Sequence, residues 1–306
     1  MEKVEIALYD SLMTPLNKIG NNWSLTGAAI APTSVNWKYY GGVQDCAISP
    51  AVLPDEKQRI TVFTDKDIMS PLVKQVESDY KVAFLHECKQ IHPFAYKFIL
   101  SLEDDFDLIV THDEGLLARG PKYVKVSTGS TWISDEKAKL YQKNKLLSHI
   151  ASNKNWAPGH QLRHIITSLI KDKVEVDFWG SAFKEFEKED KYLCLKDYCF
   201  SITVMNAKNN NYFTETLIDA FRCGTVPIFW GCENLGEYFN EKGVLRFNSP
   251  AELYDILKSL SFDKYQEMLP YVEENYHIST RHTQLDDNVA QAILSSLIQE
   301  EAHEDA

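Results

Sequence analysis

Residues 199–231 read CFSITVMNAKNNNYFTETLIDAFRCGTVPIFWG, and this stretch decides the fold of the chain. A short apolar strand over Ser201–Met205 leads through an asparagine-rich turn into a helix that begins near Thr214. Gly224 suits the position just past the helix end, and a second apolar strand follows over Thr225–Trp230. This order of strand, turn, helix and strand predicts a βαβ unit.

The turn before this helix is a candidate phosphate site. Helix N-termini carry free N–H groups and roughly half a positive charge, so they attract anions. Tyr212, Thr214, Glu215 and Thr216 lie in or beside the first turn. A nucleotide diphosphate can rest on the amides there while Glu215 reaches ribose hydroxyls. An ordinary capped helix, with Thr214 as the N-cap and Glu215 complementing the dipole, fits as well, because many βα turns bind no ligand.

The composition allows two domains or one large domain and argues against a nucleic-acid binder. Of the 306 residues, 44% are hydrophobic and 12% aromatic, which is enough to fill sizeable cores. A formal net charge of −12 argues against a broad basic surface, although a local basic cleft around Lys137–Lys145 stays open. Neither a run of about 18 apolar residues nor a signal peptide is present, which favours a cytoplasmic protein with no membrane partner.

The cysteines and histidines show no spacing typical of a disulfide framework or a metal site. The six cysteines form no CxxC pair, which predicts reduced and mostly buried thiols. They are Cys46, Cys88, Cys194, Cys199, Cys223 and Cys232. His160 and His164 have the i,i+4 spacing of two ligands on one helix, but no third ligand lies nearby in the sequence, so no metal is predicted.

Short apolar strands alternate with helices in two sets, which predicts an α/β fold of two Rossmann-like domains facing a cleft. The expected strands cover residues 4–9, 59–64, 81–85, 106–111 and 123–126, then 146–151, 174–179, 201–205, 225–230 and 244–247. The expected helices cover residues 70–76, 93–102, 159–170 and 286–299, with two more beginning near Thr214 and Ser249. The expected domains are residues 1–135 and 136–275, followed by a closing helix and acidic tail over residues 276–306.

Two side chains outside the asparagine-rich turn suit a reaction. Glu87 follows an apolar strand, and a carboxylate at a partly desolvated cleft wall can accept a proton from an alcohol. Arg163 offers a planar fork that matches diphosphate oxygens. A solvated glutamate and a surface arginine are the plainer interpretations of the same two positions. The chain has no Walker loop, no G-x-G-x-x-G and no G-x-S-x-G, which weighs against NTP hydrolysis, NAD use and a serine nucleophile.

Several segments of the C-terminal half occur in a characteristic order. They are Ala151-Ser152-Asn153, Arg163, Val176-Asp177-Phe178-Trp179-Gly180, Met205-Asn206, Tyr212-Phe213-Thr214-Glu215-Thr216, and Ala220 through Gly224-Thr225-Val226-Pro227-Ile228 to Gly231, followed by the Ser249-Pro250 helix start. This order resembles the α-1,3/1,4-fucosyltransferase family of inverting glycosyltransferases that use nucleotide sugars. The resemblance implies the GT-B fold, with the acceptor on the N-terminal domain and the donor held mainly by the C-terminal domain.

The resemblance also implies roles for single residues. Arg163 would contact the donor diphosphate, and the other donor-binding positions would be Asn206, Tyr212, Thr214, Glu215 and Thr216. Glu87, which follows His86, is the best counterpart of the family's general base.

The chain departs from the family pattern at two positions. Met205 stands where the family usually has Glu, and Thr216 stands where it usually has Lys near the donor phosphate. The loss of that cation costs about 1–3 kcal/mol of charge-assisted bonding unless another group, such as Arg222 or Lys208, supplies it.

Together these features predict an inverting glycosyltransferase that moves fucose or a related sugar from a nucleotide-diphosphate donor to an acceptor hydroxyl. The donor, with GDP as one candidate nucleotide, is a co-substrate, and no cofactor is predicted. The expected acceptor is a carbohydrate or another hydroxyl-bearing molecule, and the negative charge disfavours a nucleic acid. Two alternatives stay open: a transferase that places another sugar, such as a pentose, on a hydroxylated base of viral DNA, and an inactive nucleotide-sugar-binding protein, which Thr216 encourages.

Overall fold

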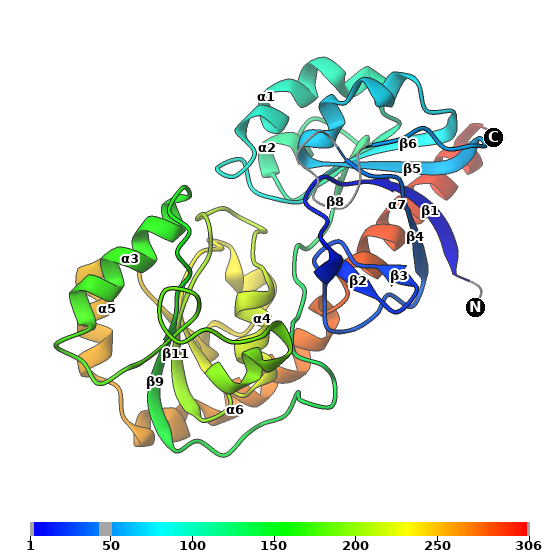
Figure 1. The fold of residues 1–306 in the computed structure, drawn as a ribbon. Helices are drawn as coiled ribbons and strands as arrows, with labels where there is room; N and C mark the ends of the chain where they lie inside the picture. The colour runs from blue at the N-terminus through cyan, green and yellow to red at the C-terminus, as the bar shows by residue number, and fades with distance from the viewer. Residues whose placement is uncertain (1–2, 43–50, 305–306) are drawn as a thin grey trace. The chain divides into compact units, whose positions relative to one another are not determined.

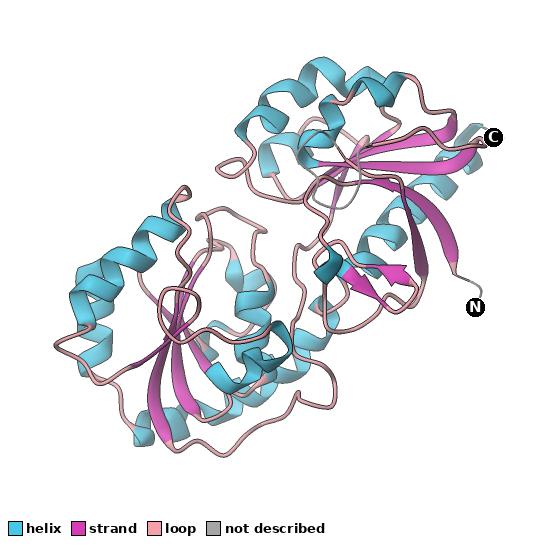
Figure 2. Cartoon of the chain, in the orientation of Figure 1, coloured by secondary structure: helices cyan, strands magenta, loops and turns pink. Residues whose placement is uncertain are grey.

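The computed structural model describes residues 3–42 and 51–304, which divide into two compact units (Figure 1). Unit 1 contains residues 1–128 and 284–306, and unit 2 contains residues 129–283. Each unit has a parallel sheet with helices on both faces, which confirms the predicted α/β class (Figure 2). The closing helix, expected to follow the second domain as a separate segment, lies in unit 1.

The main sheet of unit 1 has six parallel strands in the order β4-β1-β5-β6-β7-β8. They are β1 (Val4–Tyr9), β4 (Val35–Tyr39), β5 (Gln58–Thr64), β6 (Ser78–Leu85), β7 (Leu108–Thr111) and β8 (Tyr123–Lys125). The strand order reverses between β1 and β5. In open α/β sheets, ligands bind in the crevice outside the carboxyl ends of the strands at such a point.

Successive side chains of a strand point to opposite faces, and both faces of this sheet are buried by packed helices. Ile6 and Leu8 of β1 belong to one core, together with Leu285 and Ile293 of α7 (Leu285–Glu304). The opposite face packs against α1 (Pro93–Leu102). The smaller elements of unit 1 are β2 (Lys18–Ile19), β3 (Asn22–Trp23), α2 (Glu114–Leu117), η1 (Pro15–Asn17), η2 (Asp65–Met69), η3 (Pro71–Lys74) and η4 (Glu103–Asp105).

A buried carboxylate fixes the start of α7 in unit 1. Asp286 accepts hydrogen bonds from Ser24 Oγ, from the Leu25 N–H and from Trp37 Nε1, each at 2.8 Å. Burial raises the pKa of Asp286 to about 6. These bonds order the region around residues 22–37, whose sequence shows no clean helix or strand period.

The sheet of unit 2 has five parallel strands in the order β10-β9-β11-β12-β13. They are β9 (Lys145–Ile150), β10 (Asp177–Trp179), β11 (Tyr198–Val204), β12 (Val226–Trp230) and β13 (Leu245–Arg246). The helices are α3 (Pro158–Ile170), α4 (Glu215–Arg222), α5 (Pro250–Lys258), α6 (Phe262–Ser279), η5 (Lys188–Cys194), η6 (Leu235–Glu237), η7 (Glu241–Gly243) and η8 (Thr280–His282). The order reverses between β9 and β11, so the expected ligand position of this sheet lies at their carboxyl ends.

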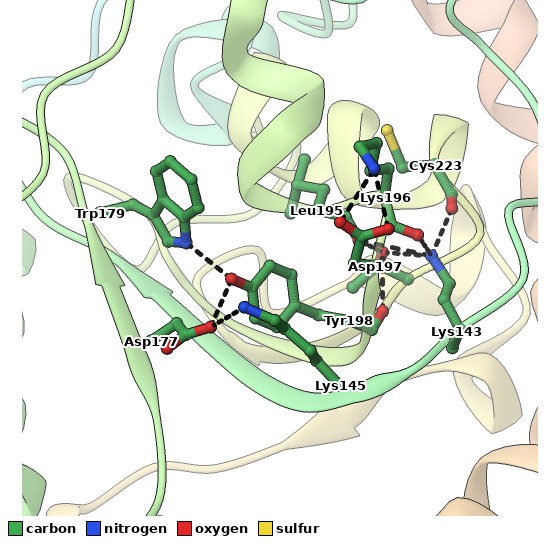
Figure 3. A network of polar contacts seen from close by, with 10 residues as sticks. Lys143, Lys145, Asp177, Trp179, Leu195, Lys196, Asp197, Tyr198 and Cys223 are labelled. Carbon is green, nitrogen blue, oxygen red and sulfur yellow. Dashed lines mark hydrogen bonds and ion pairs between the residues drawn. The ribbon is translucent and has the colours of Figure 1, made fainter.

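A polar network holds the opposite, amino-terminal edge of this sheet (Figure 3). Lys143 Nζ donates to the carbonyl of Cys223 at 2.6 Å and to the hydroxyl of Thr225 at 3.0 Å. Lys145 Nζ lies 2.6 Å from Asp177 Oδ2, which also accepts from the Tyr198 hydroxyl at 2.7 Å. These two lysines are therefore engaged within the unit.

Some local expectations are corrected. The segment expected as a helix over residues 70–76 is a single 3₁₀ turn, although Ser70 does cap it by accepting from the Leu72 N–H at 3.3 Å. Helix α6 was missed, because it carries Pro270 in its interior and its apolar residues follow the helical period only weakly. Thr214 occupies the N-cap of α4, but its hydroxyl contacts Met205 Sδ at 3.8 Å and makes no side-chain cap bond.

The cysteines agree with the sequence in the part of the chain that the structure describes. Cys194, Cys199, Cys223 and Cys232 are free and buried, Cys88 is also buried, and Cys46 lies outside the described residues. None of the helices within residues 3–42 and 51–304 combines the length and the apolar character that crossing a bilayer requires.

Candidate active site

The segment that follows the carboxyl end of β11 in unit 2 is joined tightly to the first turn of α3. The Gly159 N–H donates to the carbonyl of Asn206 at 2.9 Å. A Cβ at residue 159 would lie 1.7 Å from the carbonyl oxygen of Met205, so only glycine fits. This close approach fixes where the rest of α3 points its side chains.

One turn further along α3, Arg163 reaches the end of β11. Its Nε donates to the carbonyl of Val204 at 3.1 Å, and Nη2 contacts the same oxygen and lies 3.3 Å from Asn206 Oδ1. Burial lowers the pKa of Arg163, and the nearby Glu215 and Tyr212 oppose that shift. The structure therefore brings Arg163, Asn206, Tyr212 and Glu215 together at the point where the strand order reverses.

The asparagine-rich turn is held by a small polar network. Asn211 has a φ of 59° and is buried, and its N–H donates to Asn234 Oδ1 at 2.8 Å. Its own Oδ1 accepts from Asn234 Nδ2 at 2.9 Å and from the Tyr238 hydroxyl at 2.7 Å. Tyr212 is only 1% exposed, whereas Asn206 and the three residues 214–216 are half-buried. The half-buried residues are thus the part of the predicted donor set that can face a ligand.

Glu215 is charged and held in the first turn of α4. Its Oε1 accepts from the Thr216 hydroxyl at 3.0 Å and lies 3.4 Å from Lys191 Nζ. Burial acts to raise the pKa of Glu215, but Lys191 and Thr216 outweigh it, so the pKa is lowered from its ordinary value. Sequence reasoning missed Lys191, because 24 residues separate it from Glu215.

The two cations considered as substitutes for a lysine at position 216 are engaged elsewhere. Arg222 Nη2 lies 2.6 Å from Asp135 Oδ1, at the far end of α4. Lys208 Nζ lies 3.2 Å from Glu233 Oε1. Neither position therefore supplies a cation to the first turn of α4 in this structure.

In unit 1, Glu87 follows the carboxyl end of β6 in a tightly bonded turn. Asp65 Oδ1 accepts the backbone N–H groups of His86 and Glu87, at 3.0 and 3.1 Å. The Tyr96 hydroxyl donates to the carbonyl of Glu87 at 2.8 Å. Glu87 itself is half-buried. It belongs to unit 1, whereas the predicted donor residues belong to unit 2.

Other ionisable side chains gather at the same edge of this sheet. Asp10 follows β1, and burial together with Asp67 raises its pKa to about 7. Burial, with Glu87 and Asp10 nearby, raises the pKa of Asp65 well above its usual range. His112 follows β7, and burial lowers its pKa to about 4. Each of these groups comes directly after an apolar strand, as Glu87 does. The argument that an ionisable side chain at a strand end can take part in proton transfer therefore applies to them as well.

The two histidines with metal-ligand spacing both contact backbone groups. His160 Nδ1 accepts from the Ala157 N–H at 3.2 Å, and His164 Nε2 lies 3.0 Å from the carbonyl of Lys154. Across residues 3–42 and 51–304, no three histidine, cysteine, aspartate or glutamate side chains converge as a metal site requires.

Solved structures share this architecture. A crystal structure of an alpha1,3-fucosyltransferase with GDP-fucose superposes with a TM-score of 0.53 at 16% identity, covering 89% of this chain and 82% of that one. Anabaena Alr3699/HepE in complex with UDP superposes with a TM-score of 0.58 at 11% identity, covering 96% and 100%. At such identities the likeness is one of fold, and it confirms the predicted GT-B type.

The sequence is also similar to those of known fucosyltransferases. The chain is 32% identical over 124 residues to 4-galactosyl-N-acetylglucosaminide 3-alpha-L-fucosyltransferase 9 of Mus musculus, covering 39% of this chain and 34% of that protein. It is 30% identical over 144 residues to Alpha-(1,3)-fucosyltransferase FucT of Helicobacter pylori, covering 45% and 29%. The chain thus spans about a third of the length of these curated relatives.

A family model described as glycosyltransferase family 10 (fucosyltransferase), C-terminal part, matches residues 140–301. This match takes in the whole predicted donor set, from Arg163 to Thr216, and it covers more than half of the 306 residues. The chain therefore belongs to glycosyltransferase family 10, the fucosyltransferase family.

Proposed function

We propose that this protein is an inverting glycosyltransferase that transfers fucose or a related sugar from a nucleotide-diphosphate donor to an acceptor hydroxyl. One observation carries the proposal. Arg163 is held beside Asn206 at the carboxyl end of β11, within electrostatic range of Glu215 in the first turn of α4. A guanidinium beside a helix N-terminus is a site built for a diphosphate.

The proposed reaction is a direct displacement. Glu87 takes the proton of the acceptor hydroxyl, and the oxygen attacks the sugar C1 from the face opposite the nucleotide. The bond between C1 and the diphosphate oxygen breaks, and the nucleoside diphosphate leaves with the electron pair. Arg163 and the amides of the first turn of α4 stabilise the charge that grows on the leaving group.

The proposed donor is a nucleotide sugar, and GDP-fucose is the first to test. A solved fucosyltransferase with this fold is described with GDP-fucose, and others with the fold are described with UDP. Thr216 in place of a lysine makes a different sugar or nucleotide a reasonable second choice. A carbohydrate acceptor is proposed, because a net charge of −12 disfavours a polyanionic one.

The experiment measures transfer and binding separately. A thermal-shift panel of GDP, UDP, CDP and their sugars identifies the nucleotide, because a ligand that binds only the native state raises the melting temperature. Transfer is then followed by NMR, which also reports whether the anomeric configuration inverts. Glu87→Gln should abolish transfer and leave nucleotide affinity nearly unchanged.

Three outcomes would contradict parts of the proposal. Transfer by Glu87→Gln at near the wild-type rate would remove the base from the mechanism. Nucleotide binding without any turnover, including slow hydrolysis of the donor, would leave the inactive nucleotide-sugar-binding protein as the answer. A steep fall in affinity for duplex DNA with rising salt would instead support a nucleic-acid acceptor.

A further inference from the structure

A short 3₁₀ helix, η5, packs a buried lysine against the start of α4. Lys191 Nζ lies 2.9 Å from Asp219 Oδ2 and 3.4 Å from Glu215 Oε1. Lys191 is 3% exposed and Asp219 is fully buried. Asp219 also accepts the backbone N–H of Trp132 at 3.0 Å. Lys191 and Asp219 together therefore connect η5, α4 and the segment around residue 132.

The ion pairs of Lys191 with Asp219 and Glu215 contribute little to the stability of the fold. Removing charges from water costs several kcal/mol per ion, so buried ion pairs rarely stabilise a fold more than apolar side chains would. Burial acts to lower the pKa of Lys191, but Asp219 and Glu215 outweigh it, and the pKa is raised. The lysine therefore stays charged. Besides pairing with Asp219, it contacts Glu215 Oε1, which also accepts the Thr216 hydroxyl.

A second lysine of η5 lies at the same place. Lys188 and Lys191 are three residues apart, and in a 3₁₀ helix such residues share one face. Their Nζ atoms lie 4.8 and 4.5 Å from the centroid of the Trp132 ring, a distance at which a cation is attracted to the aromatic face. Lys188 is half-buried; burial lowers its pKa, and Glu215 opposes that shift.

The charge balance at α4 shows why these lysines matter for an anionic ligand. The helix carries Glu215 and Asp219 one turn apart, and both repel a diphosphate that approaches the N-terminus. Thr216 adds no positive charge there. Lys191 lies against both carboxylates, and Lys188 adds a second positive charge within electrostatic range of Glu215.

We propose that Lys188 binds the diphosphate of the nucleotide donor at the N-terminus of α4, and that Lys191 is a positioning residue that holds Glu215 toward the ribose. This inference rests on the proposed function, because it specifies how the donor half of that site takes a nucleoside diphosphate. It assigns a second cation of the site, in addition to Arg163, to η5, outside the strand–turn–helix segment that contains Glu215.

The first test is calorimetric binding of GDP and of UDP to Lys188→Met. We expect the Kd of the nucleotide that the wild type binds to rise about tenfold, the usual size of one charge-assisted contact, and its salt dependence to weaken. Lys171→Met, which removes an exposed lysine at the end of α3, is the matched control and should bind as the wild type does. Adding Thr216→Lys to Lys188→Met should recover most of the loss, because it returns a cation to the same turn.

The second test concerns Lys191. Lys191→Met alone leaves Asp219 buried without its cation, so the double variant Lys191→Met/Asp219→Asn is used, and its melting temperature shows that it folds. The readout is the ratio of affinities for GDP and 2′,3′-dideoxy-GDP, or for the UDP pair if UDP is the ligand. If Lys191 positions Glu215, this ratio falls toward one, whereas a purely structural role would weaken both ligands equally.

The outcomes separate this inference from the function on which it rests. If the wild type binds none of GDP, UDP and CDP, the proposed function and this inference both fail. If the wild type binds one of them and Lys188→Met binds it equally well with an unchanged salt slope, the inference alone is overturned. An unchanged ribose ratio in the double variant likewise removes the positioning role of Lys191.

Discussion

Asp65 Oδ1 accepts the backbone N–H of Glu87 at 3.1 Å, and Asp65 does so from a left-handed backbone conformation with a φ of 44°. The same oxygen accepts the N–H of His86, so one carboxyl group shapes the turn that presents Glu87. Because the pKa of Asp65 lies well above the usual range, this carboxyl is protonated more readily than an ordinary one. A neutral amide can therefore replace it.

The first prediction therefore contrasts two substitutions at this position. Asp65→Asn keeps an acceptor oxygen and tolerates the positive φ, so its free energy of unfolding should stay within about 1 kcal/mol of the wild type. Asp65→Ala leaves two N–H groups without their acceptor and should cost about 2–4 kcal/mol, with sugar transfer reduced at least tenfold. Urea denaturation and initial rates measure both effects, and equal behaviour of the two variants would contradict this account of the turn.

The second prediction concerns the contact of α3 with β11. Gly159→Ala places a methyl group where the carbonyl oxygen of Met205 lies, so the first turn of α3 must move. We expect a loss of about 3 kcal/mol or more and weaker nucleotide binding, because Arg163 moves with the helix. Gly115→Ala in α2 is the control, since the nearest atom to its added Cβ is a side-chain oxygen at 3.1 Å. Unchanged stability of Gly159→Ala would mean that this close approach is wrong.

The third prediction uses the buried imidazole of His149, which packs near Thr167 with 3.2 Å between His149 Nε2 and Thr167 Oγ1. Burial lowers its pKa from 6.5 to about 4. Between these values the unfolded chain binds a proton that the folded chain does not, so stability falls as the pH drops from about 6.5 to 4, by up to about 3 kcal/mol. Asp10 and Asp286 act in the opposite direction, because their raised pKa values let the folded chain bind protons first.

The comparison of wild type with His149→Gln isolates this effect, because the contributions of Asp10 and Asp286 cancel. Urea denaturation at pH 7 and at pH 5 should show that the variant loses less stability on acidification than the wild type, by about one proton's worth of slope. Parallel losses in the two proteins would show that His149 is not the group that resists protonation.

The fourth prediction compares two lysines of the network in Figure 3. Lys143 is half-buried with its ammonium among carbonyl oxygens, and burial lowers its pKa to about 8. Lys143→Met should cost about 2–4 kcal/mol, because several buried acceptors lose their donor. Lys145→Met removes a half-exposed ion pair with Asp177 and should cost about 1 kcal/mol or less. Thermal unfolding measures both, and a Lys145 variant that is the less stable of the two would contradict this ranking.

The sequence predicted the strand–turn–helix–strand unit well, because apolar periodicity and Gly224 are local signals. The family resemblance also predicted that Arg163 and Glu215 would belong to one donor site, and the structure places them within electrostatic range of each other. The role of Lys191 was not visible. Its segment has no clear period, and its two partners lie on another helix that only tertiary packing brings close.

The structure of the aperiodic N-terminal region could not be predicted, for a related reason. The segment around residues 22–37 is ordered by Asp286, which lies about 250 positions later in the chain. No window of neighbouring residues contains that information. Helix α6 was missed because Pro270 is a strong local signal against a helix, and its packing overrides that signal.

The closing helix α7 has a consequence for biosynthesis. Residues 129–283 form one uninterrupted stretch, whereas unit 1 is made of the two ends of the chain. A ribosome therefore releases everything that unit 2 needs before it has made Leu285 and Ile293, which cover one face of the sheet of unit 1. The half that is synthesised first thus keeps one face of its sheet without these covering side chains until α7 has been made.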